Sequence, residues 1–245
     1  MKTKLLNRDL RRRIIEKGTE MESGHFGSAF SCLDTVKYLY DNILREERDI
    51  FIMSKGHGEM ALFAVLESLG KKPKWTIHLD YNEENGIYAT TGSLGHGLPI
   101  ALGRAIAKTI KKEDGLIYVL LGDGEMEEGS NWEALTIAYH LNIKNLNLLI
   151  DWNKYQATDA VSSVASLDYK VLTERLQAFG CNTMTIDGHD IEELSYLKSL
   201  PNGLNAVILD TIKGKGVPYL EEKHSHGFDF NKYKELYKST LEDLK

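Results

Sequence analysis

The sequence is poor in cysteine and has no long hydrophobic run. Only two of its 245 residues are cysteines, Cys32 and Cys181, and they do not form a CxxC pair. This usage is typical of a reducing compartment, and we expect both thiols to be inert members of the core. No apolar stretch approaches the roughly 20 residues that a membrane-spanning helix needs, and the N-terminus is too polar for a signal peptide. These absences predict a soluble, cytoplasmic protein.

The sequence also has fewer basic than acidic residues. Lys and Arg total 30 against 36 Asp and Glu, which gives a formal net charge of −6. This balance argues against nucleic acid and an anionic membrane as main partners. The chain is 42% hydrophobic, which is enough for the core of a full α/β domain.

Several familiar site motifs are missing as well. The chain has no GxxxxGK[ST] sequence, which excludes a P-loop NTPase, and no GxGxxG after its first strand, which argues against dinucleotide binding. Its histidines lack the HExxH spacing and a partner cysteine pair, so a zinc site is not expected.

Short apolar runs alternate with helical stretches along the chain. The predicted strands are 116–121, 146–151, 182–186 and 206–209, and the predicted helices are 7–21, 32–43, 59–69, 98–112, 131–141, 168–179, 191–199 and 230–244. We expect Ser31 to cap the second helix. Because the strands show no polar alternation, they indicate an α/β fold with a doubly wound parallel sheet and helices on both faces. The loops 152–166 and 213–229 are long, which favours a functional role.

The segment 116–156 carries the strongest chemical signal. Asp123 follows one predicted strand within Gly122-Asp123-Gly124, and Asn153 follows the next strand. Ligands of such sheets bind beyond the carboxyl ends of the strands, so these two oxygen ligands should lie within reach of one another. Gly124 lets a backbone N–H approach an anion. The combination suits a diphosphate bridged by Mg²⁺.

Histidines gather in glycine-rich loops. Five of the eight lie in or beside such loops, namely His25, His57, His78, His96 and His226. A neutral imidazole both donates and accepts hydrogen bonds, so it is well suited to sugar hydroxyls. We therefore expect these histidines to cluster around a sugar substrate.

Eight segments resemble, in order, the motifs of one enzyme family. They are SGHFGS (23–28), MSKGHGEMALFAVL (53–66), TTGSLGHGLPIALG (90–103), GDGEMEEGSNWEA (122–134), DWNKYQ (151–156), IDGHD (186–190), TIKGKGV (211–217) and SHG (225–227). With these motifs the chain resembles the thiamine-diphosphate-binding half of transketolase. More specifically, it resembles the separate N-terminal subunit of a split transketolase.

This resemblance implies roles for the matching positions. The side chains of Asp123 and Asn153 and the carbonyl of Tyr155 would ligate Mg²⁺, for which Ca²⁺ or Mn²⁺ can substitute. The other residues expected at thiamine diphosphate are His57, Gly92, Ser93, Leu94, Gly122, Gly124, Glu125, Glu128 and Gln156. His25, His78 and His226 would surround the reacting ketose as catalytic histidines.

The implied reaction is the transfer of a two-carbon ketol unit from a ketose donor to an aldose acceptor. In the family, the glutamate that activates the cofactor lies on a second domain. Residues 1–245 would then form a single thiamine-diphosphate-binding domain that is inactive by itself. The pyrimidine-binding and C-terminal domains are expected on a separate subunit, in a heterotetramer.

Some positions depart from the family pattern. Phe26 stands where proline is usual, His96 stands where glutamine is common, and His78 lacks a Gly-His-Pro context. These departures point to a modified or nucleotide-linked sugar in place of a common pentose phosphate. Three alternatives stay open: a thiamine-dependent synthase or dehydrogenase subunit that decarboxylates a 2-oxo acid, a non-catalytic cofactor-binding subunit, and an α/β domain without cofactor. The roles of His96 and His224 are also open.

Overall fold

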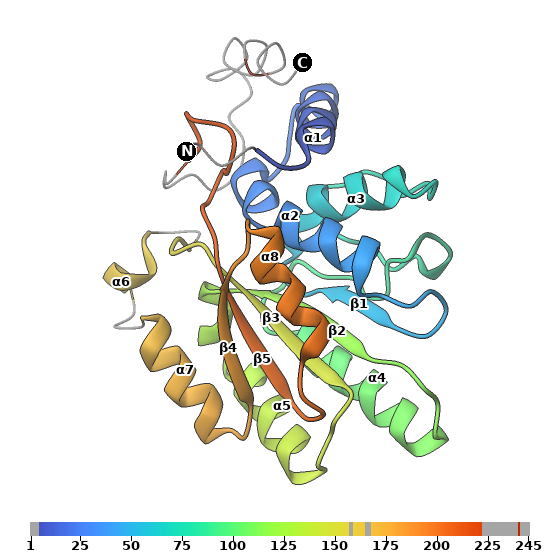
Figure 1. Ribbon diagram of the computed structural model, residues 1–245. Coiled ribbons are helices and arrows are strands. Elements are labelled where there is room, and N and C mark those ends of the chain that lie inside the picture. The colour runs from blue at the N-terminus through green and yellow to red at the C-terminus, as the bar shows by residue number, and fades with distance from the viewer. Residues whose placement is uncertain (1–4, 157–158, 165–167, 222–239, 241–245) are drawn as a thin grey trace.

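The computed structural model describes residues 5–156, 159–164, 168–221 and 240. A parallel sheet with strand order β1-β2-β3-β5-β4 runs through its centre (Figure 1). The strands are β1 (Ile50–Met53), β2 (Ile117–Gly122), β3 (Leu146–Trp152), β4 (Asn182–Asp187) and β5 (Asn205–Asp210). The predicted parallel α/β fold is confirmed.

Helices cover both faces of the sheet. They are α1 (Arg8–Met21), α2 (Phe26–Asn42), α3 (Glu59–Ser68), α4 (Gly97–Lys111), α5 (Gly129–His140), α6 (Val161–Val164), α7 (Tyr169–Ala178) and α8 (Ile191–Leu194), with short 3₁₀ turns at Gly56–Gly58, Glu83–Asn85, Gly124–Glu127 and Ser195–Ser199. One core cluster joins α1, α2, α3 and α8 to the sheet, and a second joins α4, α5 and α7 to the opposite face. This is the doubly wound arrangement.

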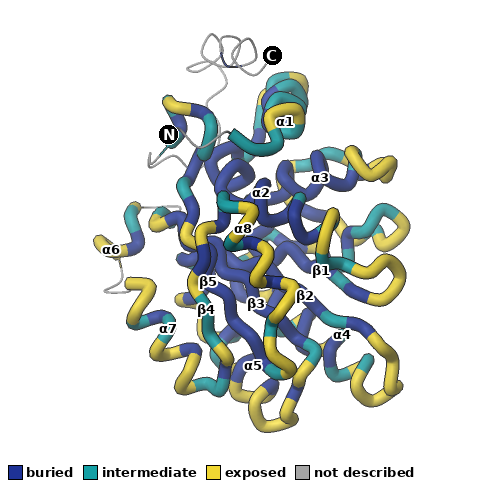
Figure 2. Tube along the Cα trace, viewed as in Figure 1, coloured by how far each residue is buried: buried dark blue, intermediate teal, exposed yellow. Residues whose placement is uncertain are grey.

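The central strands β2 and β3 are buried along their whole length because both of their faces are covered, whereas the edge strand β4 is largely polar and partly exposed. All seven residues of β3 are buried, and Leu149 faces one cluster while Leu148 and Ile150 face the other. Figure 2 shows the same pattern for the molecule, with buried strands at the centre and exposed residues on the outer sides of the helices. No helix in the described part of the chain is both long enough and apolar enough to cross a bilayer.

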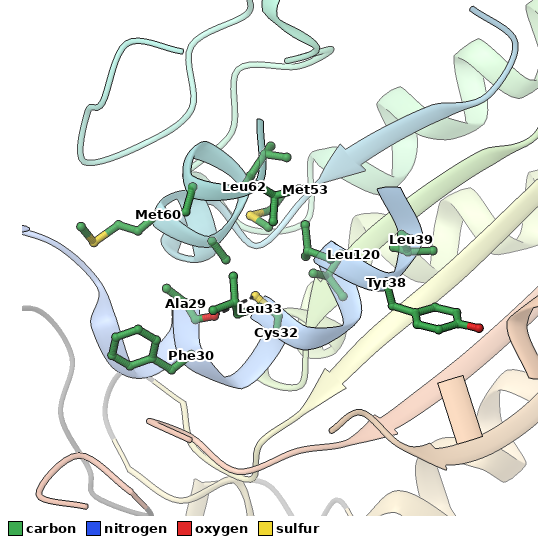
Figure 3. Packing of buried hydrophobic residues seen from close by; sticks show 14 of the residues in the cluster. Ala29, Phe30, Cys32, Leu33, Tyr38, Leu39, Met53, Met60, Leu62 and Leu120 are labelled. Atoms are coloured by element: carbon green, nitrogen blue, oxygen red, sulfur yellow. Dashed lines mark hydrogen bonds between the residues drawn. The ribbon is translucent and has the colours of Figure 1, made fainter. Parts of the chain in front are cut away.

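The two cysteines belong to the core, as expected. Cys32 of α2 lies among Met53, Leu62 and Leu120, which come from β1, α3 and β2 (Figure 3). Cys181 belongs to the cluster on the opposite face. Both thiols are free and buried, and burial raises the pKa of each to about 12. Neither is therefore a reactive thiolate at neutral pH.

Two predictions about the N-terminal third are wrong. The second helix begins at Phe26, not at residue 32, and Ser31 lies inside it rather than capping it. The Ser31 hydroxyl turns towards the sheet and donates to Asp151 Oδ2 over 2.6 Å. Strand β1 was not predicted. The helix predicted at 230–244 lies outside the described residues, apart from residue 240.

The carboxyl ends of the strands bring the sequence motifs to one edge of the sheet. β1 runs into the loop 54–58, β2 into 122–124, β3 into 153–156 and β5 into 211–213. All these strands are parallel, so the four loops meet at the same edge.

Candidate active site

A cavity of about 420 Å³ opens at this carboxyl edge. Its lining residues are His25, Phe26, Gly27, Ser28, His57, His78, Gly92, Leu94, Gly122, Asp123, Gly124, Glu125, Glu127, Glu128, Tyr155, Gln156 and Lys213. Most of the residues that the sequence assigned to the site therefore share one cavity, although they come from loops far apart in the chain.

Among the predicted site residues that the structure describes, two do not line the cavity. Ser93 is absent from its wall, and Asn153 lies buried behind it. The Asn153 amide donates from Nδ2 to Asp151 Oδ2 over 3.1 Å, and its Oδ1 accepts from the Tyr155 N–H over 3.1 Å. Asn153 thus organises the loop that carries Tyr155, and its second Oδ1 lone pair remains available for a cation.

The remaining histidines divide into two groups. His96 is the N-cap residue of α4 and does not line the cavity, so the structure gives it no place beside the other loop histidines. His224 and His226 lie outside the described residues. The expected clustering of loop histidines is therefore correct for His25, His57 and His78 and wrong for His96.

His25, His57 and His78 form the cluster. The rings of His25 and His78 stack with centroids 5.4 Å apart, and the ring of His57 meets His25 edge-on at 6.3 Å. Gly92 makes room for this stack, because a Cβ at that position would lie 3.0 Å from His78 Cγ. Its φ of +149° is also unfavourable for a residue with a side chain. The three imidazoles come from separate segments of the chain and line the same cavity.

Glu125 holds three loops of the site together. Its buried carboxylate accepts hydrogen bonds from Ser54 Oγ at 2.5 Å, from the Gly95 N–H at 3.0 Å and from the Gly122 N–H at 3.2 Å. Burial raises its pKa, although these donors oppose the shift. The loops that follow β1, precede α4 and follow β2 are therefore joined by one side chain.

Asp123 has the properties of a carboxylate that would bind a cation. Its two oxygens accept from the Gly124 N–H at 2.8 Å and the Lys154 N–H at 2.6 Å. Burial, followed by the negative charge of Asp151, raises the pKa of Asp123 to about 7. A nearby divalent ion would reverse that shift.

The donor set near Asp123 fits a hard cation. Among the described residues, no group of three or more His, Cys, Asp or Glu side chains is arranged to hold a metal. A cation here would need amide and carbonyl oxygens beside a single carboxylate, and Asn153 and Tyr155 carry such oxygens next to Asp123. Oxygen ligands of this kind suit Mg²⁺ or Ca²⁺ and do not suit zinc.

Lys213 is a site residue that the sequence analysis did not single out, although TIKGKGV was recognised as a motif. Its side chain is buried, and Nζ lies 5.6 Å from the centre of the Tyr155 ring. Burial lowers the pKa of Lys213 to about 8. Among the described residues lining the cavity it is the one Lys or Arg. Its position after β5, at the edge shared with Asp123, was the available signal.

A closed ion pair lies beneath the cavity. Lys55 and Asp151 are both fully buried and in direct contact. Asp151 also accepts hydrogen bonds from Ser31 and from Thr211, the latter over 2.5 Å. Burial favours neutral forms, but the mutual attraction outweighs it, so the pKa of Lys55 is raised and that of Asp151 is lowered.

A second closed network fixes the loop that carries Lys213. The Ile212 N–H donates to His189 Nε2 over 3.0 Å, so Nδ1 of the neutral ring carries the proton and faces Asp34 Oδ2 at 2.8 Å. Arg11 pairs with Asp34 over 2.5 Å and donates to the Lys215 carbonyl over 2.6 Å. The side chain of Lys213 is thus directed by backbone contacts on both of its sides.

Together, the doubly wound parallel sheet and the polar cavity at its carboxyl edge define a cofactor-binding α/β enzyme domain. The family model for "Transketolase, thiamine diphosphate binding domain" matches residues 4–235. The chain therefore belongs to the transketolase family, as its sequence motifs predicted.

Individual relatives agree with this assignment. An apulose-4-phosphate transketolase subunit from Phocaeicola vulgatus is 34% identical, over 89% of this chain and 85% of the relative. The 6-deoxy-6-sulfo-D-fructose transketolase subunit of a Clostridium species is 30% identical, over 96% of this chain and 93% of the relative.

A solved structure matches the fold. The crystal structure of transketolase from Campylobacter jejuni superposes with a TM-score of 0.80 at 26% identity and covers 97% of this chain. This chain spans only 41% of that transketolase, whereas it spans most of the length of the relatives named as subunits.

Proposed function

We propose that this chain is the thiamine-diphosphate-binding subunit of a two-subunit transketolase, which moves a two-carbon ketol unit from a ketose to an aldose. The observation that carries the proposal is the shared cavity of Asp123, Lys213 and the histidine cluster in a chain of this family. When bound, thiamine diphosphate supplies the ring that accepts and stabilises the two-carbon unit.

The cavity offers matching groups for each part of this cofactor. The Lys213 ammonium and the His57 imidazole suit the diphosphate, and Gly122 and Gly124 let the backbone come close to it. Gly92, Ser93 and Leu94 belong to the loop proposed to hold the pyrimidine, with Glu125, Glu128 and Gln156 around the site. Asp123, Asn153 and the Tyr155 carbonyl would hold Mg²⁺, with Ca²⁺ or Mn²⁺ as substitutes.

The histidines are proposed to act on the sugar. His25 and His78 line the cavity as a stacked pair and can donate to or accept from its hydroxyl groups. A neutral imidazole in this position can also hold a proton that leaves a hydroxyl and return it later. His226 is included in this proposal from its SHG motif alone.

The proposal also includes a second chain as partner and a modified sugar as substrate. The relatives that match along most of their length are named as transketolase subunits, which supports residues 1–245 as one domain and a second chain that supplies the activating glutamate, in a heterotetramer. Their names specify apulose-4-phosphate and 6-deoxy-6-sulfo-D-fructose, which supports a modified sugar as donor or acceptor here. A cytoplasmic location is supported by the two free, buried cysteines.

Reconstitution tests this function. The purified chain is assayed alone and with the product of the neighbouring gene, using thiamine diphosphate, Mg²⁺ and a panel of ketose donors that includes modified sugars. The proposal predicts ketol transfer only with both chains present. Ketol transfer by the chain alone, or decarboxylation of pyruvate by the complex in place of ketol transfer, would contradict it.

A further inference from the structure

A buried glutamate stands behind the histidine cluster. Glu59 is the first residue of α3 and has no exposed surface. Its Oε1 lies 3.1 Å from His25 Nδ1, while Oε2 is buried and has no hydrogen-bond partner among the described residues. Leaving half of a buried carboxyl group unsatisfied is costly, so its presence calls for a reason other than folding.

Glu59 differs from Glu125 in what its carboxyl group contacts. Both carboxyl groups are buried at this edge of the sheet, but Glu125 accepts hydrogen bonds from three loops and so has a structural task. The one side-chain partner described for Glu59 is His25. A glutamine could fill the same space. What glutamate adds is a carboxyl group that gains and loses a proton.

The surroundings of Glu59 contain several titratable groups. The charges of His25, just before α2, and of His78 act on Glu59, and Glu59 in turn acts on the buried thiol of Cys32, which also neighbours Lys55. His57 meets the ring of His25 edge-on. The ion pair between Arg13 of α1 and Glu67 lies at the far end of α3. Lys55 is already paired with Asp151. His25 is therefore the group with which Glu59 can exchange a proton directly.

We propose that Glu59 and His25 form a proton-sharing pair, in which Glu59 is a positioning residue that orients His25 and balances its charge while the imidazole holds a substrate proton. This inference rests on the proposed ketol transfer. Because Nδ1 faces Glu59, Nε2 is the nitrogen that meets a ligand in the cavity.

The proton balance gives the pair two states. With one proton, on Nδ1 and shared with the Glu59 carboxylate, the pair has a charge of −1 and Nε2 accepts. When a sugar O–H bond breaks, its proton forms a bond to Nε2, and the Nδ1 proton shifts towards Glu59 Oε1. The pair then holds two protons, is neutral overall and can return the proton from Nε2. A histidine without Glu59 would become a buried cation at this step, which is costly.

Kinetics of the complete enzyme test the proposal. In the complex with its partner, thiamine diphosphate and Mg²⁺, Glu59→Gln should lower kcat by about 10- to 100-fold and leave KM for the donor nearly unchanged. The pH profile of kcat should lose the limb that reports the titration of the Glu59–His25 pair. Glu59→Asp should keep that limb, because it restores the carboxyl group. In a His25→Asn background, Glu59→Gln should have almost no additional effect.

A matched control is available on the same helix. Glu67→Gln removes a carboxylate of α3 that is paired with Arg13 and does not contact the cavity, so it should leave kcat and its pH profile unchanged. An unaltered pH profile in Glu59→Gln, or full additivity of Glu59→Gln with His25→Asn, would overturn the proposal.

A measurement without turnover separates this proposal from the function on which it rests. Nitrogen NMR of the histidine side chains in the full chain reports which ring nitrogen of His25 carries the proton. Glu59→Gln should change the His25 signals, and Glu67→Gln should not. Unchanged His25 signals would overturn the pair, whatever the activity. If the signals change but the complex transfers no ketol unit, the proposed function fails and the pair itself remains.

Discussion

Two sets of buried carboxyl groups lie close together at the carboxyl edge of the sheet, and they differ in charge compensation. Asp34 and Asp151 form a closed set, since each contacts a buried cation of this chain, and the pKa of each is lowered. Glu59, Asp123 and Glu125 form a cavity set, in which burial raises the pKa of each member. The carboxylates of the closed set are neutralised by cations of this chain, whereas those of the cavity set are not.

We assign the closed set to the stability of the fold and the cavity set to the function of the site. The closed set joins the loops to the sheet, through Ser31 and Thr211 around Asp151 and through His189 beside Asp34. A carboxylate whose charge is uncompensated costs stability, and proteins keep such groups mainly where a ligand, ion or proton completes them. Asp123 and Glu59 fit this description, with a metal ion expected at the first and a shared proton at the second.

Breaking the closed set should have the largest effect. Lys55→Met leaves the Asp151 carboxylate buried without its cation, so the free energy of unfolding should fall by about 3 to 5 kcal/mol. Urea unfolding followed by circular dichroism measures the change. The double variant Lys55→Met/Asp151→Leu should recover part of it, because no unpaired charge then remains. A loss below about 1 kcal/mol for the single variant would show that the pair is not what holds this edge.

The pH dependence of stability should distinguish the two sets. In the metal-free protein the pKa of Asp123 is about 7, against an ordinary value of 3.8. The folded state therefore binds more protons than the unfolded state between these values, and this group lowers stability by about 2 to 4 kcal/mol as pH rises from about 4 to 7. Asp34 and Asp151 act oppositely: their lowered pKa values contribute stability that is lost as pH falls below about 4.

The Asp123 contribution is obtained by comparing unfolding curves of the wild type and Asp123→Asn. Removal of the carboxyl group should flatten the fall in stability between about pH 4 and 7. If the stabilities of both proteins depend on pH in parallel, Asp123 does not carry an uncompensated charge in the folded protein.

Within the cavity set, Asp123→Asn should also weaken cofactor binding. We expect the affinity for thiamine diphosphate in the presence of Mg²⁺ to fall by at least about 100-fold, because a proposed metal ligand loses its charge. Calorimetric titration gives the dissociation constant. Asp159→Asn removes an exposed carboxylate of the same loop region and should change binding by less than about twofold. Equal affinities for Asp123→Asn and the wild type would rule out Asp123 as a ligand.

The smallest of these effects is expected at the positive side of the cavity. Lys213→Met should reduce thiamine diphosphate affinity by about 10-fold, since it removes the charged hydrogen bond that we propose to the diphosphate. Lys215→Met is a matched control, because it makes the same charge change in the same loop but its side chain does not line the cavity. Similar losses in both variants would indicate general electrostatic attraction in place of a specific contact.

Much of the fold followed from the sequence, because the sheet is covered on both faces. Runs such as 116–121 have no polar alternation, and this pattern distinguishes a central parallel strand from an edge strand. Strand β1 was not predicted, although Ile50–Met53 is a short apolar run like 206–209. Ser31 resembled a helix cap, whereas tertiary contact with Asp151 satisfies its hydroxyl inside α2.

The site was predicted where a residue lies in a distinctive motif and missed where its role depends on burial. His25 and Asp123 were predicted from SGHFGS and GDG, and they line the cavity. The position of Lys213 as the positive group of the cavity became clear only once the loop after β5 was seen to reach it. Glu59 looks in the sequence like an ordinary acidic residue of a first helical turn, and only the fold shows it buried behind His25.

Asp123 is the member of the cavity set that thiamine diphosphate and a divalent ion are proposed to complete. Calorimetric titration of the full chain and its partner with thiamine diphosphate, with Mg²⁺ and then with EDTA, tests this most directly. We expect saturable binding with Mg²⁺ that is strongly weakened by EDTA and by Asp123→Asn. Binding that is absent in every condition, or equally tight with and without the metal, would contradict it.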